Sequence, residues 1–242
     1  RLIYSGNSES EPAITGAETS IGINAFNTNY NDNAYVGYMY GMPGSTTYQE
    51  THANANNSSI KDILDEWYQN NLLEFSDKID ENAGFCRDRT PSTNSDDINN
   101  QGGVGKIQTS YGAWVRYIGQ NNGVPTYDCS NEDLYTTSKS SNGNRALTYS
   151  IGLISMDEVW YAGGYQENNN YYLRNDNSYW TMTPCYHNIG GGEAVVFALG
   201  PSGNLSYYTV SASFDVRPVI NLSADITISS ADGTMNNPYV IN

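Results

Sequence analysis

Ionic side chains are scarce in this sequence. Only 15% of its 242 residues are charged, against about 25% in an ordinary soluble domain. Lys and Arg together number 11, whereas Asp and Glu number 26, so the formal net charge is −15. Nucleic acids and anionic lipids bind to surfaces that carry a positive field. We therefore expect no nucleic-acid partner.

Motifs for catalysis or metal binding are also lacking. The two histidines, His52 and His187, belong to no HExxH motif, no GxSxG elbow occurs, and the three cysteines form no CxxC pair. Turns around Asp32 and Asp176 could offer oxygens to calcium, but without the spacing of a calcium-binding loop. We expect no enzymatic activity, no metal site and no cofactor, with calcium the one alternative left open.

Long apolar runs are missing as well, and the polarity that is present comes from amides and phenols. No run approaches about 18 apolar residues, the length needed to span a membrane. Roughly one residue in eight is Asn, and 21 Tyr stand against 5 Phe. This composition is typical of a secreted or surface-displayed protein, and we expect an extracellular location. A hydrophobic fraction of 38% supports one core, so we expect a single domain over residues 1–242.

The three cysteines are Cys86, Cys129 and Cys185. Cys86 and Cys129 both lie in polar, loop-like segments, so in an oxidising compartment they are the better pair. Such a disulfide would stabilise the fold by about 4 kcal/mol in the chain-entropy view. We expect Cys185 to remain a free, exposed thiol, and three reduced cysteines are the alternative.

Two helices are predicted. The first is capped by Ser59, with Asp62 three residues on, and the second begins at Ser155, with Glu158 at the capping-box distance, and ends at Gly163. The apolar stripe of the first helix comprises Ile60, Ile63, Leu64, Trp67 and then Leu72 or Phe75. Its expected solvent-facing residues are Lys61, Asp62, Asp65 and Glu66. These helices are structural elements of a core, not parts of a cofactor site.

Strand and turn patterns dominate the rest of the chain. A strand or hairpin is predicted within residues 21–40, and strands follow from Tyr179 to the C-terminus. The predicted C-terminal strands are 193–199, 205–210, 216–222 and 238–241. We expect Trp180 and Arg217 to be structural, with Arg217 buried and paired with Asp157 or Glu158. The fold class is therefore α+β, loop-rich and mainly antiparallel.

Several segments resemble a known family. They are YWTMTP (179–184), AVVFALGPSGNLSYYTV (194–210), VRPVINLSADITISSADGTMNNPYVI (216–241), IGINAFNTNYNDNAYVGYMYG (21–41), THANANNSSIKD (51–62), GFCRDR (84–89) and ALTYSIGLISMDEVWYAGG (146–164). The chain resembles gut-bacterial, type IV pilin-like surface proteins with a C-type lectin-type domain, many of which are targets of diversity-generating retroelements. The resemblance implies two short helices packed on a small twisted sheet. It also implies assembly on a pilus or membrane through an N-terminal hydrophobic helix, which we expect to have been removed before Arg1.

In such proteins, adenine-directed mutagenesis of AAY codons diversifies a C-terminal segment. This process never yields Lys, Gln, Trp, Met or Glu. Lys, Gln, Trp and Met occur 19 times in the chain but are absent from residues 185–216, where Glu193 is the one residue outside the permitted set. The resemblance therefore implies that 185–216 is a variable, ligand-binding segment, whose partner is an unknown protein or glycan.

Strand alternation predicts which residues of this segment point outward. It would bury Ala194, Val196, Leu205 and Val210 and expose Val195, Phe197, Ser206 and Tyr208. The candidate ligand-binding residues are Cys185, Tyr186, His187, Ile189, Glu193, Val195, Phe197, Ser206, Tyr207, Tyr208, Ser211, Ser213, Phe214 and Asp215. The aromatic members are the expected anchors, because aromatic side chains usually dominate binding energy.

Two alternative functions remain open at the level of sequence. An invariant structural pilin or adhesin subunit would share the composition, but its segment 185–216 would not vary between sister copies. An enzyme of the formylglycine-generating type would share the fold, since a fold does not fix a function. Such an enzyme needs reactive cysteines placed in a cleft, and the sequence does not place such a pair.

Overall fold

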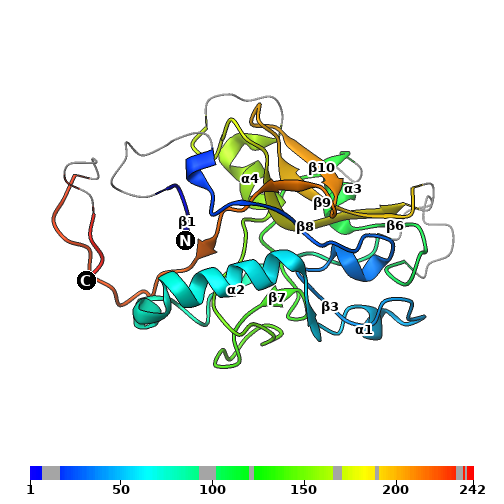
Figure 1. Cartoon of the computed structure of the whole chain (residues 1–242), viewed down its shortest axis with the longest axis horizontal. Coiled ribbons are helices and arrows are strands. Elements are labelled where there is room, and N and C mark those ends of the chain that lie inside the picture. The colour runs from blue at the N-terminus through cyan, green and yellow to red at the C-terminus, as the bar shows by residue number, and fades with distance from the viewer. Residues whose placement is uncertain are drawn as a thin grey trace.

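A central sheet of six strands organises the molecule (Figure 1). The structure is a computed structural model, and it describes residues 1–6, 17–92, 102–119, 123–165, 171–188, 191–232, 237 and 239–242. Within these residues, the strands are β1 (Leu2–Ile3), β2 (Ile23–Ala25), β3 (Met39–Tyr40), β4 (Asn56–Asn57), β5 (Phe85–Cys86), β6 (Thr109–Ser110), β7 (Leu134–Tyr135), β8 (Tyr179–Asn188), β9 (Glu193–Leu199), β10 (Leu205–Thr209), β11 (Ser213–Asp215) and β12 (Val219–Ile220).

The α-helices of the described residues are α1 (Tyr48–Thr51), α2 (Ser59–Asn71), α3 (Gly112–Tyr117) and α4 (Met156–Val159). Short 3₁₀ turns cover Ala17–Thr19, Asn33–Val36 and Leu73–Lys78, and a π-type turn, Trp160–Gly164, continues α4. None of these helices is both long enough and apolar enough to cross a membrane. The α+β class expected from the sequence is confirmed.

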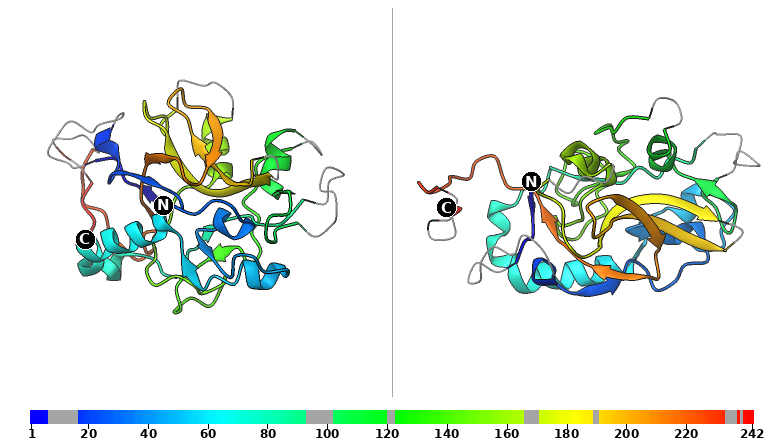
Figure 2. Two further views of the ribbon diagram at one scale, coloured as in Figure 1. Left: turned by 45° about the vertical axis from the view of Figure 1, so that its right-hand side comes forward. Right: turned by 90° about the horizontal axis from the view of Figure 1, so that it is seen from above.

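The central sheet has the strand order β10-β9-β8-β11-β2, and β6 pairs with the far end of β8. All its pairings are antiparallel except that of β11 with β8, where Asp215 pairs with Tyr179. Helix α2 lies on one side of the sheet, and α3 and α4 lie on the other (Figures 1 and 2). Separate two-stranded pairs, β1–β12, β3–β4 and β5–β7, tie the loops to this framework.

Strand β8 contains Pro184, and its register against β9 shifts on both sides of that residue. Proline has no backbone N–H to donate, so inside a sheet it is tolerated at a bulge. Beyond the bulge the pairing continues regularly, with Tyr186 opposite Val195 and His187 opposite Ala194. The bulge therefore sets which residues of the second half of β8 share a face with those of β9.

The N-cap of helix α2 is Ser58, one residue before the expected cap Ser59. The Ser58 side chain, not that of Ser59, accepts a hydrogen bond from the Lys61 N–H. Ile60 and Leu64 are buried as predicted, but Lys61 is also fully buried, which corrects its expected exposure. Its ammonium group bonds to Asp65 one turn on, so the buried charge has a partner.

The second helix matches its prediction closely. The Ser155 side chain accepts from the Glu158 N–H, and the Glu158 carboxylate accepts from the Ser155 N–H at 2.8 Å. At the other end, Gly163 has φ 110°, a conformation that favours glycine. The run 34–40 differs from its expected strand, because Asn33–Val36 is a 3₁₀ turn capped by Asp32.

Candidate ligand-binding face

The segment 185–216 contributes to four neighbouring strands, β8, β9, β10 and β11. Its residues fall on two faces of the sheet. Tyr186 pairs with Val195, and Tyr207 pairs with Phe197, so these four side chains point to one face. Tyr208 is next to Tyr207 in the strand and points to the opposite face.

The first face carries a cluster that we call the aromatic face, defined as Trp114, Tyr117, Tyr186 and Tyr207. Tyr207 is its centre: its ring centroid lies 5.1 Å from that of Trp114 and 5.7 Å from that of Tyr186. Trp114 also contacts Tyr186 at 5.3 Å and stacks on Tyr117 at 6.0 Å. Tyr207 is 37% exposed and the other three rings are half-buried, so the cluster reaches the surface.

Helix α3 supplies two members that the sequence reasoning missed. Trp114 and Tyr117 stand three residues apart, which places them on one helix face. That spacing was the available sequence signal for the helix. It was weak, because α3 is only 6 residues long, begins with Gly112 and has no side-chain cap. The helix is held against β8 by the Tyr111 N–H, which donates to the Cys185 carbonyl at 3.1 Å.

Two hydrogen bonds fix the edge of the aromatic face. The Tyr117 hydroxyl donates to the Leu205 carbonyl at 3.2 Å, which joins α3 to β10. The Tyr165 hydroxyl donates to the Tyr117 carbonyl at 3.1 Å, and its ring stacks on Trp160 at 4.0 Å. Partial burial raises the pKa of Tyr186 to about 12, so its hydroxyl stays protonated at neutral pH. The face is therefore rigid, aromatic and uncharged in itself.

A second aromatic group from the same segment lies on the opposite face of the sheet. The Tyr208 and Phe214 rings meet at 4.5 Å, and Phe214 meets Trp180 at 4.8 Å. Trp180 is fully buried, as expected of a structural residue, and it donates from Nε1 to the Asn24 carbonyl. Ser211 and Ser213 are exposed nearby in sequence, whereas Ser206 and Glu193 are half-buried. The predicted anchors are thus divided between two surfaces.

Five candidate residues are buried, which corrects their expected exposure: Cys185, His187, Val195, Phe197 and Asp215. Strand β9 has no solvent-exposed face, because α4 and the turn Asn33–Val36 both pack against it. Phe197 lies beneath the aromatic face, with its ring 5.3 Å from that of Tyr117. Ile189 lies outside the described residues.

The other buried candidates have structural surroundings. His187 lies in β8 between β6 and β9, and burial lowers its pKa. Asp215 accepts a hydrogen bond from Asn177 at 3.0 Å. Burial raises the pKa of the Cys185 thiol, which opposes formation of a reactive thiolate. The prediction that the Cys185 thiol is exposed is therefore wrong.

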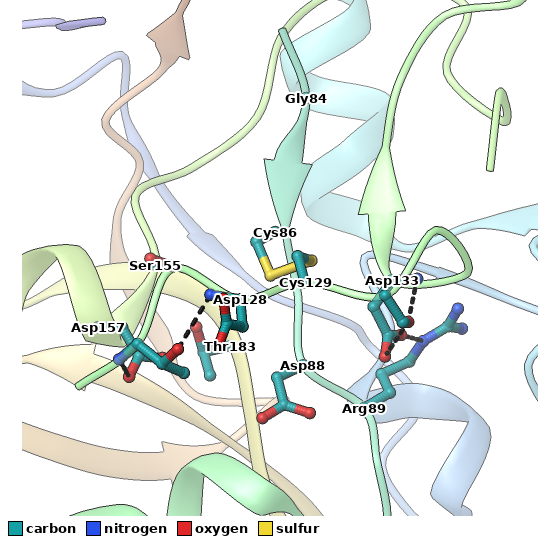
Figure 3. The surroundings of a disulfide bond; sticks show 12 residues. Gly84, Cys86, Asp88, Arg89, Asp128, Cys129, Asp133, Ser155, Asp157 and Thr183 are labelled. Atoms are coloured by element: carbon teal, nitrogen blue, oxygen red, sulfur yellow. Dashed lines mark hydrogen bonds and ion pairs between the residues drawn. A yellow bond between two sulfur atoms is a disulfide. The ribbon is translucent and has the colours of Figure 1, made fainter. Parts of the chain in front are cut away.

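The predicted disulfide between Cys86 and Cys129 is confirmed, and Cys185 is free. The bond joins β5 to the loop before β7, beside Asp88 and the ion pair between Arg89 and Asp133 (Figure 3). Arg89 Nε lies 3.0 Å from the Asp133 carboxylate, and both side chains are almost fully buried. Burial raises the pKa of Asp133 to about 6 in spite of the nearby guanidinium.

Arg217 is buried as expected, but the prediction that it pairs with Asp157 or Glu158 is wrong. Its guanidinium lies over the Tyr179 ring, 4.8 Å from the centroid, and Nε donates to the Tyr4 carbonyl at 3.1 Å. Asp157 instead binds Arg116 at 2.8 Å. Arg116 also contacts Asp88 at 2.6 Å, so it bridges two carboxylates at the start of α3 and α4.

The described residues hold no group of three or more His, Cys, Asp or Glu side chains that could bind a metal ion. At the first calcium alternative, the Asp32 carboxylate accepts from the Ala34 and Gly44 N–H groups. At the second, Asp176 pairs with Arg174 at 2.9 Å. No protein-family model, curated protein or solved structure matches the chain.

Proposed function

We propose that the protein is a non-enzymatic, surface-displayed ligand-binding protein and that the aromatic face is its binding site. The main support is one set of ring contacts: Tyr186 and Tyr207 of the candidate variable segment pack against Trp114 and Tyr117 of α3. Tyr and Trp supply large, rigid contact areas with a polar tip, which is why binding surfaces are rich in them. A fixed helix beside two variable strands would give every variant the same aromatic base.

The domain type that we propose is the C-type lectin type, displayed through a pilus or membrane anchor as in the family that the sequence resembles. The α+β class, the antiparallel run β8–β9–β10 and the disulfide are compatible with it. The burial of Val195 and Phe197 narrows the set of positions open to diversification. The positions that we propose are open to diversification are the exposed Tyr207, Ser211 and Ser213 and the half-buried Tyr186 and Ser206. Ser206 precedes Tyr207 in β10 and therefore lies on the face opposite to the aromatic face.

Binding arrays test this proposal. The domain is labelled and applied to protein and glycan arrays beside two variants, Tyr207→Ala and Tyr30→Ala. Tyr30 is 43% exposed and is no part of the aromatic face, so it is a matched control. We expect captured ligands to bind Tyr207→Ala about tenfold or more weakly, because truncation of a central aromatic anchor typically costs 2 kcal/mol or more.

The control should bind like the unmodified protein, and both variants should retain its thermal stability. A set of ligands that binds all three proteins equally would contradict the aromatic face as the site. Absence of any captured ligand would contradict the binding function itself.

A further inference from the structure

A third group of aromatic side chains, separate from the two groups described above, surrounds a hollow of about 430 Å³. Tyr127, Tyr161 and Tyr172 line it and are 66%, 52% and 76% exposed. Arg1 and Glu158 complete the set that we call the tyrosine groove. Three strongly exposed tyrosines around one hollow are not needed by the core, so their role has to be sought at the surface.

Two of the rings stack on each other, so that each covers one face of the other and the outer faces are left for a ligand. The Tyr127 and Tyr161 rings stack with centroids 4.4 Å apart and planes 20° from parallel. The Tyr161 hydroxyl donates to the Pro125 carbonyl at 2.8 Å, and the disulfide at Cys129 fixes the loop two residues beyond Tyr127. The stacked pair is therefore preorganised, which lowers the entropic cost of ligand binding.

The residues on either side of the third tyrosine, Tyr172, are held by hydrogen bonds. The Tyr171 hydroxyl donates to the Gly203 carbonyl at 2.6 Å, and the Leu173 carbonyl accepts from the Tyr179 hydroxyl at 2.8 Å. Tyr172 lies between these two anchored residues. Its side chain is thus presented to solvent from a fixed backbone.

An ion pair supplies the polar edge of the groove. Arg1 binds Glu158, and the two side chains remain 29% and 19% exposed. Arg1 Nε also donates to Asn221 at 2.8 Å, and the Glu158 carboxylate is held by its capping-box bond to Ser155. The pair is electrically neutral as a whole but offers fixed donors and a fixed acceptor side by side.

We propose that the tyrosine groove binds an uncharged carbohydrate chain. Sugar rings present C–H groups on their faces, and these are attracted to the negative face of an aromatic ring. Neighbouring sugar hydroxyls can donate to Glu158 and accept from Arg1 at the same time. Acidic sugars and phosphates are disfavoured by a protein of net charge −15.

A proline-rich peptide is the competing ligand, because such segments also lie on aromatic grooves. Its carbonyls accept hydrogen bonds but its prolines cannot donate any. It would therefore add no donor to the exposed part of the Glu158 carboxylate, whereas a sugar chain can both donate to Glu158 and accept from Arg1. This difference makes the carbohydrate the better match.

Isothermal titration of the full chain tests the proposal. The probes are cellotetraose, xylotetraose, mannotetraose and N-acetylchitotetraose, with tetragalacturonate and decaproline as competitors of different chemistry. We expect at least one uncharged oligosaccharide to bind, with Tyr127→Ala and Tyr172→Ala each weakening it about tenfold. Tyr172→Phe, which keeps the ring, should retain most of the affinity, and Tyr30→Ala should leave it unchanged.

Three results would overturn the proposal. The first is the absence of any heat of binding for every uncharged probe up to about 10 mM. A dissociation constant above this concentration would be weaker than that of ordinary specific recognition. The second is preferential binding of tetragalacturonate or decaproline. The third is full affinity in Tyr127→Ala and Tyr172→Ala. Because both tyrosines are more than half exposed, the variants are expected to fold, and their melting temperatures check this.

Discussion

At the scale of single residues, tyrosine serves the interior of this protein as well as its surface. Tyr38, Tyr111, Tyr135 and Tyr179 are all fully buried. The Tyr38 hydroxyl donates to the Ile151 carbonyl at 3.2 Å, and the Tyr111 hydroxyl donates to the Asn33 side chain at 2.8 Å. A buried phenol needs such a partner, because an unpaired polar group costs free energy in the core. Loop backbone and Asn side chains therefore supply acceptors to the core tyrosines.

This use of tyrosine limits what composition can say about function. An excess of Tyr over Phe is expected of a binding surface. Here part of the excess belongs to the core, where the rings pack and the hydroxyls bind loops. Only the tyrosines that reach the surface, such as Tyr207 and Tyr172, are candidates for ligand contact.

The buried His52 predicts a pH dependence of stability. Its Nε2 lies 2.8 Å from the Gly103 carbonyl, and burial, assisted by Arg89, lowers its pKa to about 3. The unfolded chain takes up this proton near pH 6.5. Because the unfolded state binds the proton first, the contribution to stability is full above about pH 6.5 and is lost as the pH falls towards 3, by at most about 1.4 kcal/mol per pH unit.

Urea unfolding between pH 7 and pH 4 checks this, with His52→Gln as the comparison. We expect the unmodified protein to lose stability faster than His52→Gln as the pH falls. Asp133, whose pKa is raised to about 6, has the opposite effect, but it is present in both proteins and its contribution cancels in the difference. Parallel curves for the two proteins would contradict a neutral, buried His52.

At the scale of elements, the sequence predicted the helix and strand limits that are determined by residues close by in the chain. The capping box at Ser155 and the limits of β9, Glu193–Leu199, agree with the structure. The exposure of individual residues was not predictable in the same way. Lys61 is buried because it pairs with Asp65 and lies 5.8 Å from the Tyr38 ring centroid, and Tyr38 is a contact that is remote in sequence.

The candidate site shows the same division. Tyr186 and Tyr207 were named from the segment itself, but Trp114 and Tyr117 join them only through tertiary packing of α3 on β8. Strand alternation failed for Val195 because both faces of β9 are covered. A period of two distinguishes the two faces of a strand but does not tell whether one of them meets solvent.

Two adjacent serines give a test of the helix start. Ser58 caps α2 and also donates from Oγ to the Tyr38 carbonyl at 2.7 Å within the core. Ser59 Oγ accepts from the Thr28 N–H at 3.1 Å and donates to the Thr28 hydroxyl at 3.5 Å, and both bonds lie at the surface. We expect Ser58→Ala to reduce the free energy of unfolding by about 1–2 kcal/mol, and Ser59→Ala by clearly less. Equal losses in chemical denaturation would contradict Ser58 as the cap.

At the scale of the whole molecule, charge and recognition are separated. The net charge of −15 opposes anionic partners, whereas the aromatic face itself consists of uncharged side chains. Four of the 11 basic side chains lie inside the fold rather than on a binding surface: Lys61, Arg87, Arg89 and Arg217. A fixed interior, cross-linked by one disulfide, thus supports an aromatic surface that side-chain changes can alter.

We propose that surface positions of 185–216 are diversified, whereas its buried positions are constrained by the core. Sequencing this gene, and any adenine-rich template copy beside it, from related strains tests this most directly. We predict amino-acid scatter at the exposed Tyr207, Ser211 and Ser213 and at the half-buried Tyr186 and Ser206, with buried positions held constant. The buried positions are Cys185, His187, Val195, Phe197 and Asp215. A segment as invariant as the rest of the chain, or scatter that ignores burial, would contradict it.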